Sequence, residues 1–208
     1  MTRKCGDCQL CCKLLPVKEL GKLANQKCQH QKFGVGCAIY HRCPRSCRLW
    51  SCQWLIGGDH TETLRRPDRG RYVVDIIPEY VTLQPHDGGS PRKAPVVQVW
   101  LDPRYPDAWR DPGLLTYLDE RAKQGFATLL RTSSHQAACL VAPRLTGKAD
   151  WTLMPSATCE AQHSAAEIVD TLAAYGLGFN VKLDLTPEDI MDAMARVMER
   201  RNAAEAAE

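Results

Sequence analysis

The chain opens with the stretch CGDCQLCC, residues 5–12, in which two overlapping C-x-x-C steps are followed directly by a fourth cysteine. A C-x-x-C turn brings two sulfurs to one ion while backbone amides point at them, so this spacing recurs in zinc and iron–sulfur sites. Five more cysteines follow before the linker that we expect next: Cys28, Cys37, Cys43, Cys47 and Cys52. Nine thiols exceed what one tetrahedral ion needs, and they predict at least two metal centres or one bridged cluster.

Disulfides are the first alternative for a chain of 208 residues with eleven cysteines. They belong to oxidising compartments, and both eleven and the nine of the N-terminal part are odd numbers. Residues 1–13 lack the apolar region of a secretory signal, and no apolar run approaches the roughly 18 residues of a membrane span. We therefore expect metal ligation in a soluble, cytoplasmic protein that has no membrane partner.

Positive charge is concentrated in the same part of the chain. Residues 1–54 contain ten Lys and Arg against Asp7 and Glu19, a balance of +8, so the rest of the +3 chain carries −5. A nucleic-acid surface is one explanation. The other is internal, because two divalent ions held by eight thiolates carry a charge of about −4 that nearby cations offset. The basic residues alternate with the cysteines, which favours the internal explanation over a nucleic-acid partner.

The remaining chain shows ordinary strand and helix patterns. Residues 55–70 contain Gly57, Gly58 and Pro67 and are expected to form a linker. Runs rich in β-branched and aromatic residues predict strands over residues 72–77, 80–83, 96–101, 126–130 and 137–141. Between the third and fourth runs, Asp111 as a cap, Pro112 at the first position and Gly125 as a stop predict a helix over residues 112–124.

The last part of the chain reads as helical. A capping box at residues 164–167 and a second start at Thr186 predict two helices after residue 163. Together these patterns predict an α+β protein. It has an irregular metal-stapled cysteine module over residues 1–54, the linker over 55–70, a small mixed sheet with packed helices over 71–201, and a disordered tail over 202–208.

The later cysteines have recognisable neighbours: Gly36-Cys37-Ala38-Ile39-Tyr40, Cys47-Arg48 and Cys52-Gln53-Trp54. Together with the opening stretch and Cys28, these strings resemble the YkgJ-type CxxCxxCC cysteine-cluster family, over roughly the first quarter of the chain. The resemblance implies a zinc- or iron-chelating domain, sometimes called iron–sulfur containing, whose biochemical role is largely undefined. It implies eight ligands: Cys5, Cys8, Cys11, Cys12, Cys28, Cys37, Cys47 and Cys52.

Cys43 departs from the family, which usually has an Arg-Pro pair where this chain has Cys43-Pro44. This ninth thiol is either peripheral or the completing ligand of a cluster in which three zinc ions share nine thiolates, and the peripheral interpretation is favoured. His30 and His41 also lie in the module, but eight thiolates already satisfy two ions. We therefore expect both imidazoles at the surface or behind the ligands.

Other candidate residues carry weaker signals. Cys139 lies in an apolar strand pattern and is expected to be buried filler, whereas Cys159 and His163 form a weak candidate for metal binding or nucleophilic catalysis. No phosphate loop, GxSxG elbow or HExxH string occurs, so no catalytic residue is assigned. The favoured hypothesis is a metal-binding protein that holds zinc or iron. The alternatives are an iron–sulfur redox enzyme component and a zinc module that binds nucleic acid.

Overall fold

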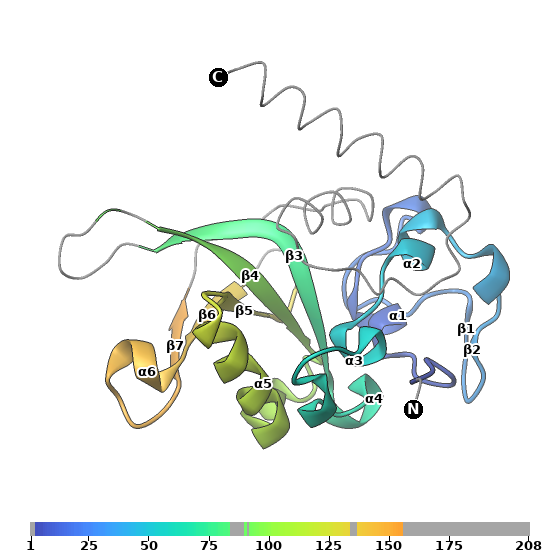
Figure 1. Cartoon of the computed structure of the whole chain (residues 1–208). Helices are drawn as coiled ribbons and strands as arrows, with labels where there is room; N and C mark the ends of the chain where they lie inside the picture. Colours follow the sequence, from blue (N-terminus) through green and yellow to red (C-terminus); the bar gives the residue numbers. More distant parts are fainter. Residues whose placement is uncertain (1–2, 84–89, 91, 134–136, 156–208) are drawn as a thin grey trace, which may run out of the picture.

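The computed structural model describes residues 3–83, 90, 92–133 and 137–155, and shows a twisted sheet with the cysteine-rich segment packed at its side (Figure 1). The sheet has five strands in the order β3-β4-β5-β6-β7. Their bounds are β3 Tyr72–Leu83, β4 Arg92–Leu101, β5 Ala127–Arg131, β6 Ala137–Val141 and β7 Thr152–Pro155. All neighbours pair antiparallel except β4 and β5, which are parallel. The predictions of an α+β class and a mixed sheet are confirmed.

Three features of the sheet differ from the prediction. The two expected strands at residues 72–77 and 80–83 are one strand, β3, in which the pairing register shifts between Ile77 and Tyr80. Pro78 lies at that shift and has no N–H to donate to the neighbouring strand. The gap that we predicted between two strands is therefore an irregularity within one strand. Strand β4 begins at Arg92 rather than Val96, and β7 was not expected at all.

Helix α5 (Pro112–Lys123) carries the chain across the sheet from β4 to its parallel neighbour β5. Its start follows the predicted chemistry, because the Asp111 carboxylate accepts a hydrogen bond from the Leu114 N–H at 3.0 Å. The chain leaves the helix through Gly125, whose φ of 89° suits glycine. The predicted helix is thus confirmed to within one residue at its end.

One face of the sheet and α5 enclose the main core. Leu114, Tyr117 and Leu118 project from the helix and are fully buried. They pack on the sheet residues Val74, Ile76, Val97, Val99, Leu130 and Leu140. The opposite face carries Val73 and Trp100, and it receives the cysteine-rich segment.

The first 70 residues contain only short elements. The α-helices are α1 Leu10–Leu14, α2 Arg45–Leu49, α3 Gln53–Ile56 and α4 Pro67–Gly70, and the hairpin strands are β1 Gln31–Lys32 and β2 Gly36–Cys37. The 3₁₀ turns are η1 Lys18–Leu20, η2 Tyr40–Arg42 and η3 Thr61–Thr63, and further along the chain lie η4 Pro106–Arg110 and helix α6 Pro143–Thr146. Helices this short are not stable alone, so contacts with the sheet and between the turns must hold this part together.

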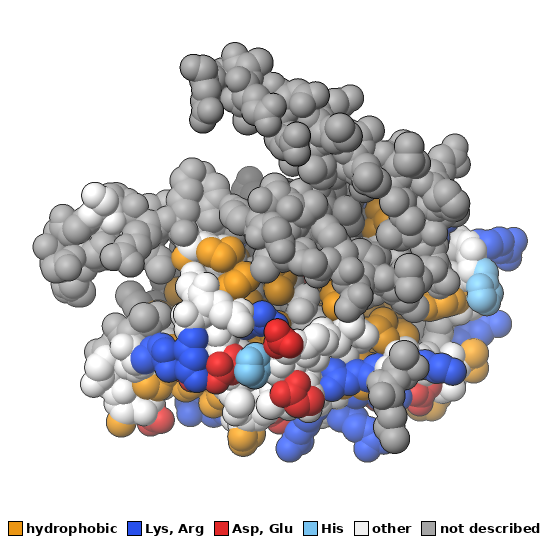
Figure 2. Space-filling model, in the orientation of Figure 1, with side chains coloured by type: hydrophobic (Ala, Val, Ile, Leu, Met, Phe, Trp, Pro, Cys, Tyr) orange, Lys and Arg blue, Asp and Glu red, His pale blue; other side chains and the backbone are white. Residues whose placement is uncertain are grey.

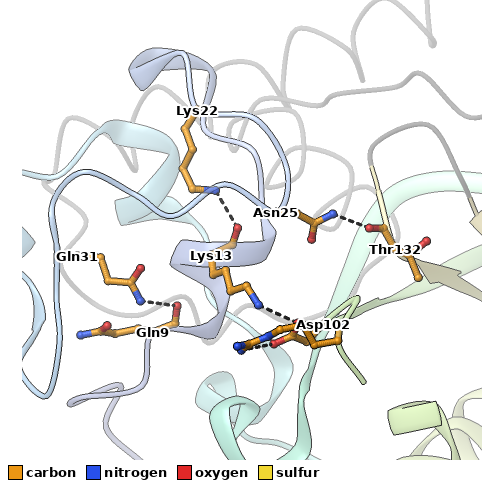
Figure 3. Close-up of polar contacts among 8 residues, drawn as sticks. Gln9, Lys13, Lys22, Asn25, Gln31, Asp102 and Thr132 are labelled. Carbon is orange, nitrogen blue, oxygen red and sulfur yellow. Dashed lines mark hydrogen bonds and ion pairs between the residues drawn. The ribbon is translucent and has the colours of Figure 1, made fainter. Parts of the chain in front are cut away.

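Helix α1 joins the cysteine-rich segment to the sheet. Leu10 and Leu14 lie four residues apart, hence on the same side of the helix, and pack against Val73 and Trp100. Beside them, the Lys13 Nζ lies 2.7 Å from Oδ1 of Asp102 at the end of β4, as Figure 3 shows. Farther along, the Asn25 side-chain amide donates to the Thr132 carbonyl oxygen at 2.6 Å.

Parts of the prediction fall outside the described residues. The two C-terminal helices, the tail over residues 202–208, Cys159 and His163 all belong to this group. Among the residues that are described, no helix is long and apolar enough to cross a membrane.

We expect Lys13→Ala to destabilise the protein by about 1–3 kcal/mol, because it removes a cation from a carboxylate that is 0% exposed. Arg104 would remain as the other partner of Asp102, with its guanidinium 3.1 Å away. Urea unfolding at neutral pH measures the loss. Lys18→Ala, in the exposed part of the same segment, is the control and should change stability by less than about 0.5 kcal/mol.

The same variant has a signature in acid. Burial alone would raise the pKa of Asp102, but hydrogen bonds from Arg104 and Lys13 outweigh it and lower the pKa to about 2. A lowered folded-state pKa contributes stability above the unfolded value of about 3.9 and loses it as the pH falls through the folded value. The difference between wild type and Lys13→Ala should therefore shrink from roughly pH 4 to pH 2. A constant difference across that range would contradict this assignment.

Candidate metal centre

The opening C-x-x-C stretch forms a tight turn. The Cys8 N–H donates to the Cys5 carbonyl at 3.0 Å, and Gly6 between them adopts a positive φ of 53°. The Cys5 thiol in turn contacts the Cys8 carbonyl at 3.7 Å. The turn therefore presents both sulfurs close to its own backbone, as the C-x-x-C spacing predicts.

Four thiols gather around this turn, and we call Cys5, Cys8, Cys11 and Cys52 the first thiol set. Cys52 comes from the start of α3, yet it packs with Cys11 beside the Leu10 and Leu14 contact. Burial, followed by negative charge on Cys8 and Cys5, raises the pKa of Cys52 to about 12. Charge on Cys5 and Cys52 likewise raises the pKa of Cys11. The mutual influence shows that these four sulfurs share one region.

A second thiol set contains Cys12, Cys28, Cys43 and Cys47. The Cys28 N–H donates to the Cys12 carbonyl at 3.1 Å, which ties the two backbones together. The sulfur of Cys47 is surrounded by protein although the residue as a whole is exposed. That desolvation, followed by the charges of Cys43 and Cys12, raises its pKa to about 12.

Lys22 lies at the second thiol set with its side chain almost entirely buried, at 6% residue exposure. Its ammonium donates to the carbonyl oxygens of Lys13, at 3.3 Å, Leu15 and Leu23. Burial lowers the pKa of Lys22, and negative charge on Cys28, Cys12, Cys11 and Cys47 opposes that shift. A buried ammonium is costly without compensation, so this lysine matches thiols that carry negative charge.

The two sets meet at the neighbouring residues Cys11 and Cys12 on α1. A hydrogen bond between their thiols, followed in effect by burial, raises the pKa of Cys11 well above its ordinary value. The same hydrogen bond, helped by the charge of Lys22, lowers the pKa of Cys12 to about 7. The hydrogen bond thus favours the proton on Cys11 and the negative charge on Cys12.

Cys37 approaches the first thiol set through the hairpin. A Cβ at its neighbour Gly36 would lie 2.7 Å from the Gly6 carbonyl oxygen, so the hairpin and the C-x-x-C turn are in close contact there. The side-chain amide of Gln9 donates to the Gly36 carbonyl at 3.3 Å and also to that of Lys32. Cys37, one of the eight ligands that the family resemblance implies, therefore lies on the side of the first set but outside it. Cys43, which was expected to be peripheral, lies beside Cys47 in the second set.

The ten described cysteines are thiols rather than disulfides. Within the described residues, no three His, Cys, Asp or Glu side chains are arranged closely enough to hold a metal ion. The donor set nevertheless suits a thiophilic metal, because four thiolates are the ligands of structural zinc and of iron–sulfur clusters. Each set would have to lose protons and close further to become a coordination shell.

The other candidates separate clearly from the thiol sets. His30 contacts the neighbouring Gln29 side chain at 3.3 Å, and His41 packs edge-on against the Tyr40 ring. Cys139 is partly buried against Val96 and Leu129 in the sheet, and burial raises its pKa. Sequence patterns did not single out Lys22, because a lysine is ordinarily expected at the surface.

No family model, curated protein or solved structure matches this chain. The resemblance to the YkgJ-type family therefore stays a prediction that rests on the cysteine strings of the first 54 residues.

In metal-free protein, Cys12 should be alkylated by iodoacetamide at neutral pH well before Cys8 and Cys52. The thiolate is the reactive form, and the pKa of Cys12 is lowered to about 7 whereas burial raises that of Cys8 to about 11. Mass spectrometry of peptides after short exposure measures the order. Lys22→Met should slow the reaction at Cys12, and Lys27→Met, an exposed lysine of the same segment, should not. Equal rates at Cys12 and Cys52 would show that the hydrogen bond and the ammonium do not activate Cys12.

Proposed function

We propose that this chain is a metal-binding protein whose N-terminal thiolates hold two or more zinc or iron ions, the iron as an iron–sulfur cluster. One observation carries the proposal. Cys52 lies forty residues after Cys12 in the sequence, yet it joins Cys5, Cys8 and Cys11, while Cys12 joins a separate set with Cys28, Cys43 and Cys47. Two sets of four thiols match the ligand number of two tetrahedral ions.

The energetics of the segment support this proposal. Short helices and turns give residues 1–54 little core of their own, and a segment of this size rarely gains more than a few kcal/mol from apolar burial. Structural zinc typically adds on the order of 10 kcal/mol or more to folding. A bound metal would therefore be the main source of stability for the parts of the segment that do not touch the sheet.

Electrostatics support the same proposal. Deprotonated thiolates around divalent ions leave a net negative charge, and Lys22 supplies a buried positive charge beside four of the thiols. Metal binding would remove the cost that burial places on the Cys52 and Cys8 thiolates, since a coordinated thiol is deprotonated. In this arrangement the metal acts structurally, and no catalytic residue is assigned.

The resemblance of the cysteine strings to the YkgJ-type family is a further argument, and we propose that the chain belongs with that group. Zinc and iron share these ligands, so the identity of the metal is a matter for experiment. An iron–sulfur cluster would give visible charge-transfer absorption and acid-labile sulfide. Zinc would leave the protein colourless.

Protein purified without oxygen should contain about two zinc ions per chain, or iron together with acid-labile sulfide where the thiols hold iron–sulfur clusters, measured by elemental analysis. Cys52→Ser should lose about half of that metal, because it removes a ligand from the first thiol set only. The matched control is Cys139→Ser, a cysteine of the sheet that lies in neither set, and it should keep the full metal content. Stoichiometric zinc or iron that survives Cys52→Ser and Cys12→Ser together would contradict the proposed ligands.

A strong chelator should make the N-terminal segment sensitive to trypsin at Lys13, Lys27 and Arg45 while the sheet stays resistant. The reason is that the metal stabilises the segment, whereas the sheet and α5 have their own apolar core. Limited proteolysis before and after chelation, followed by mass spectrometry, locates the cuts. Cleavage that is unchanged at those three sites would show that metal does not hold the segment.

A further inference from the structure

An open pocket of about 800 Å³ lies between α4 and the C-x-x-C turn. Its lining residues are Asp7, Arg65, Arg66, Asp68, Arg69 and Arg71. Four arginines and two aspartates thus line one open surface. Lys and Arg side chains with acidic residues among them are visible along the lower edge of Figure 2, the edge where Figure 1 places α4.

Arg66 uses both of the pocket's carboxylates. Its Nε and Nη2 donate to the two oxygens of Asp68, each at 2.6 Å, and its Nη1 donates to Asp7 at 2.8 Å. These contacts raise the pKa of Arg66, so this guanidinium stays charged and paired. Arg66 therefore serves as a clamp that joins α4 to the C-x-x-C turn.

The positive charges of the other three arginines are paired with carboxylates to different degrees. Arg65 pairs with Oδ2 of Asp111 at 2.9 Å. The guanidinium of Arg71 lies 4.8 Å from the centre of the Tyr105 ring, and neither it nor Arg69 pairs with a carboxylate among the described residues. Arg69 and Arg71 are therefore the two guanidinium groups of the pocket that no carboxylate of the described residues holds. Because Arg66 faces two carboxylates, the four arginines exceed Asp7, Asp68 and Asp111 by one charge.

The backbone that carries these arginines is firmly held. Pro67 and Gly70 of α4 are buried, and the Gly70 N–H donates to the Arg66 carbonyl at 2.9 Å. The Arg71 N–H donates to the Pro67 carbonyl at 2.8 Å, and Arg71 itself adopts a positive φ of 63°. The fixed backbone and the contact of Arg71 with the Tyr105 ring reduce the entropy that is lost when a ligand binds.

We propose that this pocket binds a phosphate group, either free phosphate or a small phosphate monoester, through Arg69 and Arg71. The planar guanidinium fork matches phosphate oxygens, and the guanidinium groups of Arg69 and Arg71 are the two that no carboxylate of the described residues occupies. Arg66 holds Asp7 and Asp68, and their carboxylates are acceptors for hydroxyl groups of the phosphate or of a small ligand. The pocket adjoins the first thiol set, because Asp68 interacts with the Cys8 thiol and Asp7 lies within the C-x-x-C turn.

The experiment is a calorimetric titration of the full-length protein with inorganic phosphate at constant ionic strength, repeated with phenyl phosphate as the monoester. We expect saturable binding that Arg69→Gln and Arg71→Gln each weaken by roughly tenfold or more, the usual effect of losing one charged hydrogen-bonding partner. The matched control is Arg110→Gln, an arginine that stacks on Trp109 outside the pocket and should bind as wild type does. Circular dichroism confirms that each variant is folded.

Every outcome decides the proposal. Saturable binding that is lost in Arg69→Gln and kept in Arg110→Gln supports it, and the tighter of the two probes identifies free phosphate or a monoester as the ligand. Absence of saturable binding, or equal loss in Arg110→Gln, overturns it. Binding of a short oligonucleotide that depends on Arg69 while neither phosphate probe binds would also overturn it, in favour of a nucleic-acid surface.

Discussion

Helix α1 has only five residues, yet it packs against the sheet and carries thiols of both sets, and the rest of the cysteine segment is arranged around it. Leu10 and Leu14 share one side of the helix and pack on the sheet. Cys11 and Cys12 follow one another on this helix, and their thiols hydrogen-bond each other. Packing of the two leucines thus places the pair of adjacent thiols where the two sets meet.

The boundary between the cysteine segment and the sheet is built from buried charges as well as apolar contacts. Asp102 is reached by Lys13, Lys22 caps the carbonyls that follow α1, and the buried Asp75 of β3 interacts with Trp50. Burial raises the pKa of Asp75 to about 7, against a hydrogen bond from Trp50 that lowers it. Buried ionic groups contribute little net stability but are costly to leave unpaired. They therefore favour one docking position of the segment over others.

Local signals explain what could be predicted from the sequence. Helix α5 was predicted nearly to the residue because its cap, first-turn proline and final glycine all act within a few positions of the helix. Strands β4, β5 and β6 were found because β-branched residues are dense in them. Strand β7 was missed because Thr152–Pro155 is short and ends in proline, and it pairs only because β6 offers an open edge.

The candidate site required information that no local pattern contains. Spacing predicted that nine cysteines bind metal in at least two centres or one bridged cluster, but it could not state which distant thiol lies beside which. That depends on the turn of chain that returns Cys52 to α1 and on the backbone bond from Cys28 to Cys12. The burial of Lys22 could not be predicted from the sequence either, since it depends on the loop that folds over the end of α1.

The nine cysteines of the segment differ in how firmly packing holds them in place. Cys8 and Cys52 are 5% and 7% exposed, and Cys11 lies on a helix that is packed against the sheet. Cys37 belongs to a hairpin of two-residue strands whose tip carries Phe33 at 96% exposure. A ligand held in place beforehand loses less entropy on binding than one that must be ordered. In the proposed metal centre the anchored thiols would therefore be the stronger ligands. Cys37 would complete or bridge the first set through the contact between Gly36 and the C-x-x-C turn.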